Sequence, residues 1–214
     1  MANNAMNRER GIAGTNSYAK DLGFDLVALL AEKLEHQDRV SWLDLCCGTG
    51  KALIEAGQEF EKRGLGDRVR VRGVDLVGYF LSVPAGITSL SLEVSPLREF
   101  EPAEIFDLVT CVHGLHYVGN KLGLVARASQ WLQPDGLFLA NLDLASVKLV
   151  EGSAGRRVPR ALREAGMVYD ARKRLLSCRG RREVDLPFGL VGADDQAGPN
   201  YTGQPAVDSY YRAL

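Results

Sequence analysis

Apolar and polar residues follow one another in runs that predict strands alternating with helices. Four runs are apolar throughout or alternate with polar residues, as strands do, and they lie at Val40–Cys47, Val69–Leu76, Ile87–Val94 and Ile105–His113. Apolar residues recur at helical spacing in three stretches, at Asp21–Glu35, Lys51–Arg63 and Asn120–Leu132. A turn at Pro134–Gly136 leads into a further strand that runs to Asp143. Three short strands separated by basic turns are then expected, at Met167–Arg172, Leu175–Arg179 and Arg182–Val191.

The first strand and the helix after it organise the chain. Between them lies a turn of small residues, Gly48 to Gly50. This geometry brings bare backbone N–H groups and a positive helix end to a ligand. Asp44, inside the strand, would repel a phosphate but can accept hydrogen bonds from an amine or a cation. A dinucleotide-binding fingerprint needs a third glycine, where this chain has Leu53.

The pattern Asp44-x-Cys46-x-Gly48-x-Gly50 resembles motif I of the class I S-adenosylmethionine (SAM)-dependent methyltransferases. It departs from the motif at Cys46, which stands where the family has its first glycine. In the family, the acid that ends the second strand binds both ribose hydroxyls and the apolar residue after it packs on the adenine. The resemblance assigns these places to Asp75 and Leu76, which begin 25 residues after Gly50.

Two later segments strengthen the resemblance. The fourth strand resembles the family's F-D-L-V motif, and the backbone that follows it, at Val112, is expected to border the methyl group. The turn before the fifth strand resembles the family's L-x-P-G-G, with Asp135 at the first glycine. The family's adenine-binding Asp falls on Ser95, which brings no charge.

The resemblance covers Val40 to Asp143, about half of the chain. It implies an α/β fold: a three-layer Rossmann-like sandwich whose seven-stranded, mostly parallel sheet has an antiparallel terminal strand. A single domain is expected from the length. Residues 1–38 would form an N-terminal lid and helix, 39–191 the core, and 192–214 a tail over the acceptor site.

The implied activity is methyl transfer from SAM, with S-adenosyl-L-homocysteine (SAH) as product and no metal. The enzyme supplies mainly proximity, plus a base where the acceptor must lose a proton. His113 and His116 flank the end of the fourth strand and are the candidate bases. Tyr18 is a candidate cofactor contact. The acceptor candidates are Tyr117, Asp194, Asn200 and Tyr201.

The acceptor is expected to be a small molecule. The N/D-P-P-Y/F motif of many DNA, RNA and glutamine methyltransferases is absent, because that position holds Cys111-Val112-His113-Gly114. The compact chain and its tail resemble bacterial specialised-metabolite methyltransferases, with an O or N atom as the acceptor. An unstructured tail is the plainer alternative for residues 192–214.

Composition adds limits rather than a function. A formal net charge of −1 gives no reason to expect nucleic acid or a membrane as a partner. The four cysteines show no metal-ligand spacing, and reduced thiols in a cytoplasmic monomer or homodimer are the simplest expectation. Two alternatives stay open at this point: an NAD-type oxidoreductase and a non-catalytic SAM-binding module.

Overall fold

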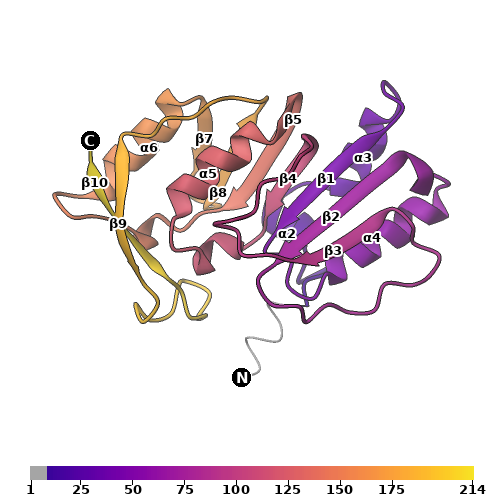
Figure 1. Ribbon diagram of the computed structural model, residues 1–214, viewed down its shortest axis with the longest axis horizontal. Coiled ribbons are helices and arrows are strands. Elements are labelled where there is room, and N and C mark those ends of the chain that lie inside the picture. Colours follow the sequence, from indigo (N-terminus) through magenta and orange to yellow (C-terminus); the bar gives the residue numbers. More distant parts are fainter. Residues whose placement is uncertain (1–8) are drawn as a thin grey trace.

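The structure is a computed structural model that describes residues 9–214; residues 1–8 of the expected N-terminal lid lie outside the described part. Its main element is a seven-stranded sheet in the order β3-β2-β1-β4-β5-β8-β7 (Figure 1). β1 to β5 run parallel, and β8 is antiparallel to both of its neighbours. The strands are β1 (Val40–Leu45), β2 (Val69–Asp75), β3 (Leu90–Val94), β4 (Phe106–Cys111), β5 (Leu132–Asn141), β7 (Met167–Asp170) and β8 (Leu175–Arg179). The predicted mostly parallel sheet is confirmed.

Helices cover both faces of the sheet, because successive strand residues point to opposite sides. On one side α2, α3 and α4 bury apolar residues in the same cluster as Trp42 of β1. On the other side α5 and α6 do so with Leu43, the next residue along β1. The helices are α2 (Tyr18–Leu22), α3 (Leu26–Lys33), α4 (Lys51–Lys62), α5 (Lys121–Gln130) and α6 (Ala154–Glu164), with short 3₁₀ turns η1 (Gly66–Arg68), η2 (Gly114–Tyr117) and η3 (Leu144–Ser146). The three-layer α/β sandwich is therefore as predicted.

The single helix predicted over Asp21–Glu35 is wrong, because two helices share that stretch. Gly23 ends α2 with a left-handed φ of 75° and donates its N–H to the carbonyl of Ala19. The Asp25 side chain then accepts from the N–H of Ala28 and begins α3. A left-handed C-cap glycine and an aspartate N-cap are strong stop and start signals, and they override the continuous leucine spacing.

The C-terminal part differs most from the prediction. The strand expected at Arg182–Val191 is observed as β9 (Phe188–Asp194), and it belongs to a second sheet rather than to the large one. The stretch expected to form a tail, residues 192–214, contains β10 (Asp208–Ala213). With β6 (Val147–Leu149) these strands form a three-stranded sheet in the order β6-β10-β9. In Figure 1 this small sheet lies beyond α6 and β7, at one end of the molecule.

Candidate active site

A cleft of about 1240 Å³ opens at the carboxyl ends of the parallel strands. Ligands of open α/β sheets bind at this edge. One part of its lining comes from the ends of β1 and β2 and is called here the glycine wall; it comprises Cys46, Gly48, Asp75 and Leu76. Another part, called the histidine wall, comprises His113, Tyr117, Leu190, Ala193 and Pro205. Val112, at the end of β4, also lines the cleft.

The shape of the glycine wall comes from three residues, at alternate positions of the turn, whose backbone is left-handed. The φ angles are 59° at Cys46, 62° at Gly48 and 75° at Gly50. Such angles are easy for glycine and strained for cysteine. A Cβ on Gly50 would lie 2.8 Å from Cδ1 of Leu92, so the turn also packs closely on β3. Gly50 caps α4 without a side chain, which leaves the first N–H groups of that helix open at the turn.

Asp75 is fixed by the backbone at the edge of the cleft. Its Oδ2 accepts the N–H of Gly48 at 2.9 Å, and its Oδ1 accepts the N–H of Val77 at 2.9 Å. Each carboxylate oxygen has a second lone pair, so two hydroxyl groups of a ligand can still donate to it. Leu76, beside it, is 65% exposed within the cleft lining. A fixed acceptor next to an exposed apolar side chain suits a ribose joined to a flat base.

Asp44 lies beneath this wall and does not line the cleft. Its carboxyl is fully buried and accepts hydrogen bonds from the hydroxyls of Tyr18, at 2.6 Å, and Thr110. Burial raises the pKa of Asp44 to about 7, against the lowering effect of these two bonds. The same burial, with the charge of Asp44, raises the pKa of the Tyr18 hydroxyl. Asp44 and Tyr18 therefore support the glycine turn from below.

The histidine wall joins the turn after β4 to the C-terminal segment. His113 has a left-handed φ of 56° and precedes η2. The N–H of Val207 donates to the carbonyl of His116 at 2.8 Å. The Nζ of Lys121, a fully buried residue, donates to Val207 O and to Ser209 Oγ. The segment that contributes Ala193 and Pro205 to the cleft is thus held against η2 and the start of α5.

The predicted site residues fall into two groups. Cys46, Gly48, Asp75, Leu76, Val112, His113 and Tyr117 line the cleft. The others do not contribute to its lining: Tyr18, Asp44, Gly50, Ser95, His116, Asp194, Asn200 and Tyr201. Ser95 donates its N–H to the carbonyl of Asp75, and it is the next residues, Pro96 and Leu97, that reach the cleft. The roles assigned to both groups stay predictions.

Several side chains in or beside the cleft are not predicted from the sequence; Val77 and Leu190 line it, and Asp21 and Arg174 contact predicted site residues. Asp21 Oδ2 lies 3.3 Å from Nε2 of His113, and Arg174 stacks on the ring of Tyr201 at 3.8 Å. The sequence places Asp21 at the start of a predicted helix and Arg174 in a basic turn between two predicted strands. No local motif marks either residue, because both contacts join segments far apart in the chain.

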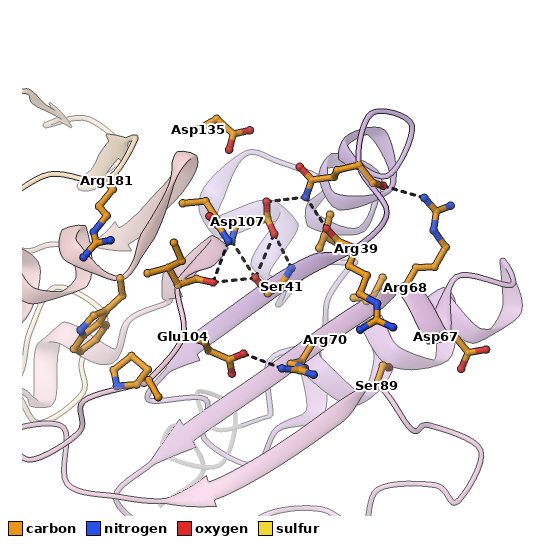
Figure 2. Close-up of a pocket in the computed structure, with 18 of the residues that line it drawn as sticks. Arg39, Ser41, Asp67, Arg68, Arg70, Ser89, Glu104, Asp107, Asp135 and Arg181 are labelled. Carbon is orange, nitrogen blue, oxygen red and sulfur yellow. Dashed lines mark hydrogen bonds and ion pairs between the residues drawn. The ribbon is translucent and has the colours of Figure 1, made fainter.

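A second cavity, of about 1170 Å³, lies at the opposite edge, where the parallel strands begin. Several of its charged groups have partners within the protein: Arg70 pairs with Glu104 at 2.9 Å, and Asp107 accepts from the backbone and the hydroxyl of Ser41 (Figure 2). Arg68 donates to three backbone carbonyls between α3 and β1. These bonds tie loops together, and the first cleft is the candidate active site. In the part of the chain that the structure describes, no cluster of three metal-ligating side chains occurs and no helix is long and apolar enough to cross a membrane.

Residues 15–183 match a family model described as a methyltransferase domain. The chain belongs to this family. The methyltransferase prediction is confirmed, and with it the resemblance to that class of enzymes. The oxidoreductase alternative is not supported. Among curated proteins, none matches the sequence.

Several solved structures share parts of the fold. N-methyltransferase NodS from Bradyrhizobium japonicum WM9, in complex with SAH, is 16% identical at a TM-score of 0.48, over 84% of this chain and 98% of that one. Coclaurine N-methyltransferase, bound to N-methylheliamine and SAH, is 22% identical at a TM-score of 0.43, over 60% and 37%. CalS10, an amino pentose methyltransferase from Micromonospora echinaspora with SAM bound, is 23% identical at 0.41, over 60% and 58%. This chain spans less than two thirds of the last two.

Proposed function

We propose that this methyltransferase acts on an oxygen or nitrogen atom of a small molecule, a bacterial specialised metabolite. One observation carries the proposal: the glycine wall, which suits the cofactor, and the histidine wall, which offers a proton acceptor, line the same cleft. We further propose that the chain works as a single domain in the cytoplasm, as a monomer or homodimer, without nucleic acid or a membrane as partner.

The residues of the glycine wall fit the cofactor. Asp75 would hold the two ribose hydroxyls, and Leu76 would pack on the adenine. Pro96 and Leu97 extend the apolar surface on the same side. The glycine turn lets the chain approach the amino-acid part closely. When bound, SAM supplies an electrophilic methyl group on a sulfonium.

The histidine wall would hold the acceptor. Leu190, Ala193 and Pro205 offer mainly apolar contact, which excludes water from the reacting atoms. His113 is 8% exposed and lines the cleft, so its ring is within reach of a bound molecule. An acceptor that carries a proton on the atom to be methylated would donate to this ring. Residues 192–214 cover this side of the cleft through Ala193 and Pro205.

Calorimetric titration with SAH, and with NAD as a control ligand, tests the cofactor site. We expect saturable binding of SAH alone. The Asp75→Asn variant should lower the affinity for SAH by about tenfold to a hundredfold for each hydrogen bond to a ribose hydroxyl that is lost. This is the free energy of a hydrogen bond to a charged group. The matched control is Asp67→Asn, which makes the same change near the amino end of β2, outside the cleft.

Each result has a definite meaning. Normal SAH affinity in Asp75→Asn would contradict the proposed ribose contact, and binding of NAD would contradict the cofactor site as a whole. Once SAH binds, incubation with SAM and candidate hydroxyl and amine acceptors tests the reaction. Failure of every acceptor while SAH binding persists would favour the non-catalytic SAM-binding module.

A further inference from the structure

Three segments far apart in the chain meet around the ring of His113. Asp21 comes from α2, His113 from the turn after β4, and Tyr201 from the loop between β9 and β10. Asp21 Oδ2 is 3.3 Å from Nε2 of His113, and the Tyr201 hydroxyl is 3.4 Å from its Nδ1. Carboxylate, imidazole and hydroxyl thus follow one another in a line, beside the cleft that His113 lines.

The carboxylate decides which ring nitrogen carries the proton. Burial raises the pKa of Asp21, but hydrogen bonds and charge from His113 and Arg10 outweigh it and the net pKa is lowered. Arg10 Nε is 2.7 Å from the same Oδ2. An ionised carboxylate only accepts hydrogen bonds, so the neutral imidazole must carry its proton on Nε2. Nδ1 then carries no proton, and its lone pair can accept a hydrogen bond.

The groups on the Nδ1 side are neutral hydrogen-bond donors. Burial lowers the pKa of His116 to about 3, so this ring is uncharged in ordinary buffers. Its Nε2 lies 3.4 Å from Nδ1 of His113, and its own Nδ1 has no partner within the described residues. The Tyr201 ring is covered by Arg174, whose Nε is 3.8 Å from Asp143. The charges around His113 are therefore Asp21 and Arg10 on one side, and Arg174 and Asp143 on the other.

We infer that Asp21 is the positioning residue of the reaction: it holds the His113 proton on Nε2 and makes Nδ1 the atom that takes the acceptor's proton. This inference rests on the proposed function. The acceptor's O–H or N–H bond breaks, its electron pair stays on the acceptor atom, and the proton binds Nδ1. Asp21 then stabilises the resulting imidazolium through Nε2–H. The acceptor replaces the Tyr201 hydroxyl at Nδ1, so it must carry a proton on the atom that is methylated.

Histidine NMR tests this arrangement without a known acceptor. Long-range proton–nitrogen spectra of ¹⁵N-labelled protein show which ring nitrogen is protonated, and the chain has only three histidines. His36→Gln and His113→Gln assign the signals. We expect the neutral His113 ring to carry its proton on Nε2. In Asp21→Asn this preference is lost, because an amide can donate to Nε2 as well as accept from it.

Two further variants make the test specific. Tyr201→Phe removes the contact on the Nδ1 side and keeps the carboxylate, so the proton should stay on Nε2, in contrast to Asp21→Asn. Asp25→Asn is the matched control: it lies four residues after Asp21, caps α3, and asparagine caps a helix equally well. It should leave the His113 signals unchanged.

The outcomes separate this inference from the proposed function. A proton on Nδ1 of His113, or an unchanged tautomer in a folded Asp21→Asn variant, would overturn the role of Asp21 even where SAH binds. Absence of SAH binding in a wild-type protein with the expected tautomer would instead overturn the cofactor site. We expect Asp21→Asn to bind SAH with wild-type affinity, since Asp21 does not line the cleft.

Discussion

The two walls of the cleft are built in different ways. The glycine wall takes its residues from the ends of β1 and β2, which are neighbours in sequence and in the sheet. Its shape follows from left-handed backbone angles within one short turn. The histidine wall joins residues about ninety positions apart. The hydrogen bond from the N–H of Val207 to the carbonyl of His116 is one of the contacts that hold these residues together. Local geometry makes the first wall, and long-range contacts make the second.

The largest effect is expected beneath the glycine wall, at Asp44. Asp44→Ala leaves the buried hydroxyls of Tyr18 and Thr110 without their acceptor. Each unsatisfied buried group costs about 1–3 kcal/mol, so the free energy of unfolding should fall by about 2–6 kcal/mol in total. Denaturant unfolding measures the loss.

Asp44→Asn is the control for this change, because its amide keeps an acceptor oxygen. It should restore most of the lost stability. The opposite result would be an Asp44→Ala variant that unfolds at the same denaturant concentration as the wild type but no longer binds SAH. Asp44 would then contact the cofactor directly, and the distinction between Asp44 as a supporting residue and Asp75 as a binding residue would be wrong.

The contrast between the walls explains what the sequence could reveal. The turn from Asp44 to Gly50 and the acid Asp75 could be predicted, because a motif of fixed spacing specifies local backbone geometry. The burial of Asp44 beneath the turn could not, since it depends on how Tyr18 packs over it. The strands of the large sheet were predicted from apolar and alternating runs, and their arrangement in one mostly parallel sheet from the resemblance to the family.

The C-terminal sheet and the contacts of His113 with Asp21 and Tyr201 could not be predicted in this way. β10 pairs with β6, which is only three residues long, and with β9 across a loop rich in turn-forming residues. Short strands with weak alternation give little signal on their own. Asp21 carries no mark of its partnership with His113, because the contact exists only once α2 has packed near the end of β4.

A smaller effect is expected in the part that supports the histidine wall, at Tyr211. Its hydroxyl accepts the N–H of Leu122 at 3.0 Å and donates to Asn120 at 3.2 Å, and the residue is 1% exposed. Tyr211→Phe should cost about 1–2 kcal/mol. Because these bonds join β10 to the start of α5, hydrogen exchange should rise in β10 while β1 and β2 stay protected.

The neighbouring Tyr210→Phe is the control for that measurement, because the Tyr210 hydroxyl makes no hydrogen bond to any residue between 9 and 214. It should leave both the stability and the exchange pattern unchanged. Faster exchange throughout the large sheet in Tyr211→Phe would show that the two walls unfold as one unit, against the division drawn between them.

The smallest effect is expected at Cys46, where the glycine wall departs from the family's motif. Its φ of 59° is easy only for glycine. Cys46→Gly and Cys46→Ala remove the same sulfur, so the difference between them isolates the backbone strain. The left-handed conformation costs alanine about 1–2 kcal/mol, against the roughly 0.5–1 kcal/mol that glycine loses in chain entropy. Cys46→Gly should therefore be the more stable by about 0.5–1 kcal/mol in denaturant unfolding. Both variants should bind SAH as the wild type does, because the side chains of this wall that are proposed to contact the ligand are those of Asp75 and Leu76. An alanine variant as stable as the glycine one would mean that position 46 is not held in the left-handed conformation, and the turn would then owe its shape to packing rather than to local geometry.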